Sequence, residues 1–430
     1  MALTNPQETI DERPVCCTYA SGRVFYGLKN NIYYSQIMEG ESIDKLSRCY
    51  QQNDPTSERL SDLLDTDGGT LQVGGASSII QLAKFRTGVL IYSTNGIWYL
   101  SGPDTGFTAT NFFLNQVSTT GCVSPESVVA VEDVHYFWGQ DGIFVVSEND
   151  FGRPQVSSVV ENTLQSFYND IPLAAKKKSY GCYNSVKKQV EWHYASTAQS
   201  SGTSYRDSAD KSLVLDTRAG GLWPQEYNSV LEEASGNFIG ASVNTTQSTE
   251  DLDEVKVIMT MGAPGASTQN YSITFANKSI QSENQFADFA VAYPAAYIET
   301  GYETLDKPSN KKSAPYIVTH FLQTEQNWVS DGAGGFEHDF QSGCTMRAKW
   351  DWNNSSANGR WSPPQQAYRF SRTFIAPDVA GVFDSGERVI TTKSKMLGRG
   401  KALSIRFEQV EGKDMQVLGY TTLFSVKGKV

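Results

Sequence analysis

Short apolar segments joined by turn residues recur along the first half of the chain. Residues 89–100 read as strand, Asn95-Gly96, strand, and residues 134–146 repeat this around Asp141-Gly142. An earlier copy, residues 24–34, turns at Asn30-Asn31. Asn-Gly and Asp-Gly favour type I′ turns, because both central residues of such a turn have positive φ. The pattern therefore predicts a series of β-hairpins with type I′ turns.

The spacing of these hairpins indicates a larger repeat. Ile97 and Ile143, each directly after its turn, are 46 positions apart, and a looser copy at residues 180–194 places Val190 another 47 positions on. One four-stranded propeller blade typically spans about 40 to 50 residues. Ile32 lies 65 positions before Ile97, and an insertion at about residues 39–69 would account for the excess. The fold class predicted is all-β, a β-propeller with an inserted β-rich platform; the alternative is a β-sandwich with coincidental hairpins.

The second half of the chain has a different pattern. Residues 1–199 are predicted to form the first propeller blades, and residues 200–335, which are polar and contain few clear repeats, an inserted platform or irregular blades. Residues 336–430 are predicted to form closing blades that pair with the first strand near Cys17. The last forty residues alternate apolar and polar positions, as half-buried antiparallel strands do. Short helices are predicted only at residues 56–64 and 159–168.

Charge argues against a protein that grips nucleic acid. Acidic residues outnumber basic ones by 47 to 36, which gives a net charge of −11, and no long basic stripe is present to neutralise phosphates. The short basic runs, Lys176-Lys177-Lys178 and residues 393–401, are interpreted as solvated faces or local partner contacts. An acidic surface still permits DNA to slide past it. The segment after Met1 has neither the basic region nor the apolar run of a signal peptide, and no run reaches the ~18 residues of a membrane span.

Residues that could carry chemistry do not form known motifs. The six cysteines have no CxxC spacing, so reduced and mostly buried thiols are expected rather than a zinc or redox site. The four histidines, His135, His193, His320 and His338, are predicted to be packed or hydrogen-bonded rather than metal ligands. Neither HExxH nor GxSxG nor a P-loop occurs. Residues 398–401, Gly-Arg-Gly-Lys, are interpreted as a turn, and the acidic residues 250–254 as a solvated loop. No catalytic, cofactor-binding or metal-binding residue is therefore predicted, and no cofactor.

Several segments resemble the tail nozzle proteins of short-tailed bacteriophages, also called tail tubular protein B or tail hub proteins. The resemblance lies in residues 95–102, 106–110, 117–125 and 137–143, and in the closing residues 392–402 and 412–414. It covers about residues 80–195 and 340–425. The motifs involved are structural, and the middle of the chain, about residues 200–335, has no counterpart.

The resemblance implies a structural virion protein and not an enzyme. Such a protein is made in the host cytoplasm, joins the virion tail, and forms a ring, hexameric in that family, beneath the portal and its adaptor protein. Tail fibre or needle proteins would lie beside or below the ring. The ring would be a channel that retains the DNA genome and passes it during ejection, without a membrane anchor. Two other functions stay open: a β-propeller enzyme acting on carbohydrate, either a lyase or a glycosidase, since two facing carboxylates suffice for hydrolysis, and a propeller scaffold in a cellular complex.

Overall fold

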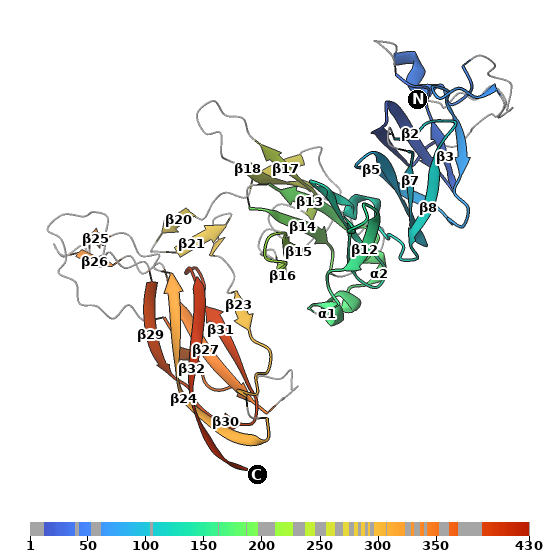
Figure 1. Cartoon of the computed structure of the whole chain (residues 1–430). Helices are drawn as coiled ribbons and strands as arrows, with labels where there is room; N and C mark the ends of the chain where they lie inside the picture. Colours follow the sequence, from blue (N-terminus) through green and yellow to red (C-terminus); the bar gives the residue numbers. More distant parts are fainter. Residues whose placement is uncertain are drawn as a thin grey trace. The chain divides into compact units, whose positions relative to one another are not determined.

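The computed structural model is built almost entirely of β-strands. It describes residues 13–38, 43–52, 62–103, 106–161, 163–185, 187–196, 211–226, 237–245, 255–262, 270–274, 279–282, 285–288, 291–292, 296–306, 308–322, 328–330, 336–338, 342–351, 361–368 and 389–429. The chain divides into two compact units, Met1–Phe275 and Ala276–Val430 (Figure 1). The all-β prediction is confirmed.

The first unit contains four antiparallel sheets, each made of four consecutive strands. Sheet 1 consists of β1 (Cys16–Ala20), β2 (Arg23–Leu28), β3 (Asn31–Tyr34) and β4 (Gly69–Gln72). Sheet 2 consists of β5 (Ile79–Phe85), β6 (Gly88–Ser93), β7 (Gly96–Ser101) and β8 (Phe113–Ser118). Sheet 3 consists of β9 (Val129–Val131), β10 (Val134–Trp138), β11 (Ile143–Glu148) and β12 (Pro154–Ser158). Sheet 4 consists of β13 (Tyr180–Asn184), β14 (Gln189–Tyr194), β15 (Lys211–Asp216) and β16 (Leu222–Glu226).

Successive sheets pack against each other through separate hydrophobic cores. Phe25 and Trp98 belong to the core between sheets 1 and 2, Tyr92 and Phe137 to the core between sheets 2 and 3, and Trp192 to the core between sheets 3 and 4. In sheets 1 and 2 the first strands β1 and β5 lie close together, and so do β9 and β13 in sheets 3 and 4, whereas sheets 2 and 3 come close at their last strands, β8 and β12. Strand β13 also lies near β17 (Asn237–Thr245). Each sheet alone has too little surface to bury its apolar face, so stacking supplies most of its stability.

The predicted hairpins form, but the predicted type I′ turns at Asn95-Gly96 and Asp141-Gly142 are wrong. Strands β6 and β7 stay paired as far as Ser93 and Gly96, so Thr94 and Asn95 make the connection. Neither Gly96 nor Gly142 has a positive φ. Gly96 is required for space instead, since a Cβ there would lie 2.9 Å from the carbonyl oxygen of Ser118. Among the two-residue hairpin connections of sheets 1 to 3, Ser21-Gly22 has positive φ at both positions, at 48° and 72°.

The repeat matches three of the four sheets. Ile32, Ile97 and Ile143 all lie in the third strand of their sheets, and the intervening insertion lies between β3 and β4. Val190, however, lies in β14, the second strand of sheet 4, so its interval of 47 does not mark the same position. The third strand there is β15, which follows residues 197–210. A hairpin of similar composition at a different place in the sheet produced this false match.

A buried arginine ties the insertion of sheet 1 to the strands. Arg23 on β2 has no exposed surface, and its guanidinium donates to the carbonyl oxygens of Ser35, 2.8 Å away, Asp65 and Asp67. Burial lowers the pKa of Arg23 to about 10, and the two aspartates act in the opposite direction. The guanidinium thus replaces water for carbonyl groups that the insertion would otherwise leave unpaired.

Helices are few in the described residues. The helix predicted at residues 159–168 begins later, as α1 (Gln165–Asp170), and α2 (Leu173–Lys176) follows it. Two 3₁₀ turns span Ile43–Ser47 and Pro125–Ser127. Most of residues 56–64, where the other helix is predicted, lie outside the described residues.

Three further strands, β17, β18 (Val255–Gly262) and β19 (Asn270–Thr274), form the last sheet of the first unit. In the second unit, β20 (Ser279–Ser282), β21 (Gln285–Asp288) and β22 (Val291–Ala292) make one small sheet, and β25 (Trp328–Ser330) and β26 (Phe336–His338) a hairpin. Two larger sheets share one core. In the first of these two sheets the strand order is β23 (Tyr297–Glu299), β31 (Leu403–Gln409), β27 (Cys344–Trp350) and β28 (Gln365–Gln366). The other contains β29 (Val389–Lys395), β24 (Asn310–Leu322), β30 (Arg399–Gly400) and β32 (Val417–Lys429).

The predicted strands at the end of the chain are present, but their predicted partners are wrong. Strands β29 and β32 pair with β24, and β31 pairs with β23 and β27. Residues 336–430 are therefore not closing blades next to Cys17, whose strand β1 pairs with β2. Residues 200–335 are not one inserted platform either, because β15 and β16 complete sheet 4 while β23 and β24 belong to the second unit.

Candidate interaction surface

The histidines whose side chains are described are buried or hydrogen-bonded, as the sequence predicts. His135 on β10 is buried, and its Nδ1 lies 3.1 Å from the hydroxyl of Tyr92. His320 on β24 pairs its Nδ1 with the hydroxyl of Thr391 at 3.0 Å. His193 on β14 is buried beside Cys182, and strand pairing brings Glu191 next to them. This cluster arises from strand pairing, so the sequence position of each histidine does not reveal it. The side chain of His338 and the acidic residues 250–254 lie outside the described residues.

The two basic runs differ in role. Lys176 is buried. Its ammonium group donates to the carbonyl oxygen of Gln140 at 3.0 Å and lies 4.1 Å from the ring centroid of Tyr168. Lys176 is therefore part of the packing around α2 and not of a solvated face. Lys177 and Lys178 are exposed. Residues 393–401 begin on β29, where Lys393 and Lys395 are exposed, and turn at Gly398, whose φ is +111°.

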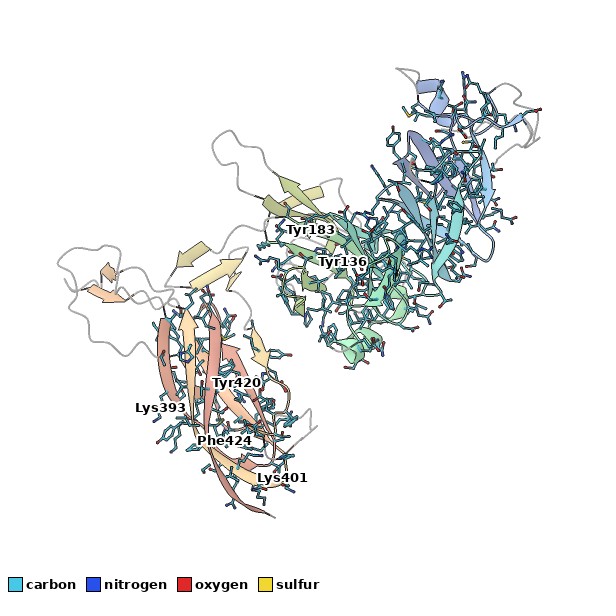
Figure 2. All side chains as sticks on the ribbon, viewed as in Figure 1. Tyr136, Tyr183, Lys393, Lys401, Tyr420 and Phe424 are labelled. Atoms are coloured by element: carbon cyan, nitrogen blue, oxygen red, sulfur yellow. The ribbon has the colours of Figure 1, made fainter. Side chains whose placement is uncertain are left out.

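The outer face of the sheet formed by β29, β24 and β32 combines lysines with apolar side chains. The register places Lys395, Tyr316 and Leu423 in one row across the three strands. The ammonium group of Lys393 lies 4.3 Å from the ring centroid of Tyr316. Lys393 projects from β29 in Figure 2. Tyr316 and Leu423 are each more than 40% exposed. An exposed set of this kind is typical of an interaction site.

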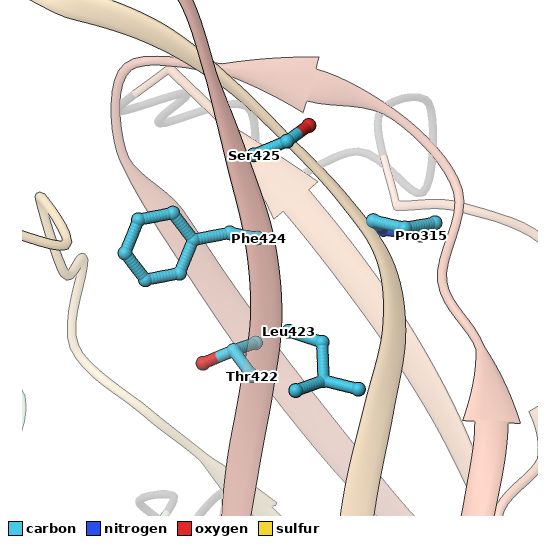
Figure 3. Close-up of a pocket in the computed structure, with 5 residues that line it drawn as sticks. All are labelled: Pro315, Thr422, Leu423, Phe424 and Ser425. Carbon is cyan, nitrogen blue, oxygen red and sulfur yellow. The ribbon is translucent and has the colours of Figure 1, made fainter.

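The strand β32 supplies the edge of this surface. In the described residues it pairs with β24 alone, so its other side has backbone groups available for another strand or partner. Leu423 and Phe424 point to opposite sides of β32, and a shallow hollow of about 370 Å³ separates this strand from Pro315 (Figure 3). Pro315 lies where the pairing of β24 with β32 shifts register, which fits a residue that lacks an N–H group.

Charge is distributed unequally between the two units. The first unit contains 31 acidic and 18 basic residues, a net charge of −13, whereas the second contains 16 acidic and 18 basic residues, a net charge of +2. The strands β24, β29 and β32 together contain six lysines and no Asp or Glu. Lys311, Lys393 and Lys395 are exposed and Lys312 is buried, so an acidic chain has exposed lysines on a sheet whose strands β24, β29 and β32 contain no carboxylate. Such a sheet is complementary to acidic surfaces, including that of the first unit.

The cysteines are free thiols. Five are buried and Cys17 is exposed, which agrees with the expectation of reduced, mostly buried cysteines. Burial raises the pKa of the five buried thiols to about 12, so they stay protonated near neutral pH; they are Cys16, Cys49, Cys122, Cys182 and Cys344. Within the described part of the chain, the helices are too short and too polar for any to cross a bilayer.

Comparisons with known proteins identify no family. No family model matches the chain, and no curated protein matches it. Among solved structures, an exported protein of Bacteroides fragilis is 6% identical with a TM-score of 0.26, over 56% of this chain and 63% of that one. An apocarotenoid oxygenase mutant of Synechocystis is 8% identical with a TM-score of 0.26, over 57% of this chain and 65% of that one. The chain thus spans less than two thirds of either. At these scores the likenesses carry no argument about function.

Proposed function

We propose that this chain is a structural virion protein, a tail nozzle of a short-tailed bacteriophage. Copies of the chain form a closed ring, six if the resemblance in the sequence holds, whose channel retains the DNA genome and passes it during ejection. The protein catalyses no reaction in this role. The tail adaptor binds above the ring, and fibre or needle proteins bind beside or below it.

The observation that carries the proposal is the unequal charge of the two units. A ring of identical copies needs head-to-tail interfaces, in which two different surfaces of the chain meet. The first unit, with a net charge of −13, and the carboxylate-free sheet of β29, β24 and β32 form such a complementary pair. The exposed side chains of Tyr316 and Leu423 provide the apolar area that charge pairs alone lack.

The stacked four-stranded sheets support the fold that this function requires. Four sheets follow one another along the chain, and neighbours come close at their first strands in sheets 1 and 2 and in sheets 3 and 4, and at their last strands in sheets 2 and 3. This is the local arrangement of propeller blades. We propose that the first unit is a β-propeller-like array, and that the second unit is an additional β-sandwich domain and not a continuation of the blades.

The mass of the purified full-length chain in its native state tests the proposal, with electron microscopy of the same sample. The expected result is a ring-shaped particle of uniform copy number, with no turnover of polysaccharides. A chain that stays monomeric at every concentration, or that cleaves polysaccharide, would overturn the proposal and favour the carbohydrate-active alternative.

A further inference from the structure

Three potential metal ligands converge on one face of sheet 4. Cys182 on β13 pairs directly with Glu191 on β14, and His193 lies two positions farther along β14. Residues two apart on a strand share a face, and so do directly paired residues. All three side chains therefore project from the same face, and their ligand atoms lie within 4.8 Å of one another.

The distances suit a tetrahedral cation. The sulfur of Cys182 and Nε2 of His193 are 3.8 Å apart. A tetrahedral zinc ion with Zn–S of about 2.3 Å and Zn–N of about 2.0 Å holds these two atoms about 3.5 Å apart. A movement of a few tenths of an ångström would therefore close the site. No change of strand register is needed.

Packing on both faces of the sheet fixes the strand that carries Glu191 and His193. Val190 and Trp192, which alternate with Glu191 and His193 along β14, are fully buried in the core against sheet 3. Tyr180 stacks on the imidazole of His193 with ring centroids 5.3 Å apart. Both contacts hold the ligand atoms in place before any ion binds, which reduces the entropic cost of binding.

Cys182, Glu191 and His193 form a polar cluster that is mostly buried within an otherwise apolar sheet. Cys182 and His193 have less than a tenth of their surface exposed. On binding a metal, the thiol of Cys182 would release its proton. Thiolate, carboxylate and neutral imidazole would together carry a charge of −2, which a divalent cation balances. A polar group also lies near: Ser212, paired with His193 in the sheet, has a fully buried hydroxyl with no hydrogen-bond partner in the described part of the structure.

We propose that Cys182, Glu191 and His193 bind one zinc-like divalent cation, with a fourth position left for water or another donor. The ion would join β13 to β14 and stabilise sheet 4. This inference does not depend on the proposed function. It departs from the expectation, drawn from the absence of CxxC spacing, that the chain has no metal site: strand pairing produces the cluster, and sequence spacing does not reveal it.

Metal content and cobalt spectroscopy test the site, both in the full-length Cys17→Ser background, because exposed Cys17 could bind metal by itself. The reduced protein should retain about one zinc ion per chain, as tetrahedral sites with a thiolate ligand do. Replacement by Co²⁺ should give visible d–d bands and a thiolate-to-cobalt charge-transfer band. Cys182→Ser should abolish the charge-transfer band, and Glu191→Gln should preserve it while weakening affinity at least about tenfold. Cys344→Ser, at a buried cysteine of the second unit, is the matched control and should change neither.

X-ray absorption of the zinc-loaded protein keeps the test independent of whether any variant folds. The expected first shell contains one sulfur and otherwise nitrogen or oxygen. A folded, reduced protein that takes up no zinc and no cobalt would overturn the proposal. So would a first shell without sulfur, a charge-transfer band that survives in Cys182→Ser, or its loss in Cys344→Ser.

Discussion

At the scale of single residues, burial decides the chemistry of the histidines more than their neighbours in sequence do. His135 lies among aromatic side chains, with the ring of Phe85 at 90° to its own and the hydroxyl of Tyr92 at its Nδ1. Removal from water disfavours the charged imidazolium and lowers the pKa of His135 to about 4. The sequence predicts the packing, because the residue occurs in an apolar strand. It does not predict the partner, which comes from a strand 43 positions away.

The lowered pKa predicts a pH dependence of stability. The unfolded chain binds a proton at His135 below pH 6.5, whereas the folded chain resists it down to about pH 4, so stability present above pH 6.5 is lost as the pH falls. Between pH 8 and pH 5 the loss from this residue is about 2 kcal/mol. His135→Gln should lose less stability over this range by that amount, measured by urea unfolding followed through tryptophan fluorescence. Equal losses in both proteins would refute the assignment.

Position 96 requires glycine, as the sequence predicts, but because of the space around it and not because of its φ. The dipeptide Asn95-Gly96 predicts positive φ, but Gly96 lies inside β7, where Trp98 and the carbonyl oxygen of Ser118 occupy the space of a side chain. Gly96→Ala should therefore destabilise the protein by about 1 to 3 kcal/mol, through crowding and not through strain in φ. Gly221→Ala, where no atom lies within 4 Å of the new Cβ, is the control and should be nearly neutral. Similar thermal stability for both variants would contradict this account.

At the scale of elements, alternation and turn residues predict strands well and their place in a sheet less well. The hairpins of sheets 1 to 3 can be recognised because short apolar runs end at polar turn residues, and the strands of residues 389–424 because apolar and polar positions alternate. Partners far along the chain leave no such pattern. The pairing of β24 with β29 and β32 joins segments separated by about 70 and 100 residues, and only the packed core of the second unit specifies it.

Asn95 connects two elements of sheet 2. Its amide nitrogen donates to the carbonyl oxygen of Gly75 at 2.8 Å, and its Oδ1 accepts from the backbone N–H of Ser77 at 2.9 Å, so the β6–β7 connection is tied to the chain entering β5. Asn95→Ala should lower the free energy of unfolding by about 1 to 3 kcal/mol, because both backbone groups lose their partner. Asn111→Ala is the matched control, since the contacts of Asn111 with Thr108 use its backbone. A stability of Asn95→Ala equal to that of the control would show that the link is unimportant.

At the scale of the whole molecule, the charge of each unit carries more information than the net charge. The value of −11 predicts only that the chain does not grip DNA, whereas the division at residue 275 separates −13 from +2. The sequence alone suggested boundaries near residues 200 and 335. Those boundaries follow changes in composition. The actual division follows strand pairing between distant segments, which cannot be predicted from composition.

The proposed head-to-tail contact predicts that reversing charge on the basic sheet disrupts assembly. Lys393→Glu with Lys395→Glu should raise the subunit dissociation constant by at least about tenfold, because like charges would then face each other. Lys177→Glu with Lys178→Glu makes the same change at exposed lysines of the acidic unit and should leave assembly intact. Sedimentation at several salt concentrations would measure both, with the wild-type interface weakening as salt rises. Equal assembly of the two double variants would exclude the basic sheet from the interface.

The central claim is that copies of this chain form a closed ring around the path of DNA. Cryo-electron microscopy of the protein in its native virion, at a resolution that places strands, tests it most directly. The account predicts a closed ring with the second unit of each copy against the first unit of the next, and acidic side chains facing the lumen, where they discourage contacts with phosphate. A chain that is monomeric in its particle, or a channel lined mainly by Lys and Arg, would contradict it.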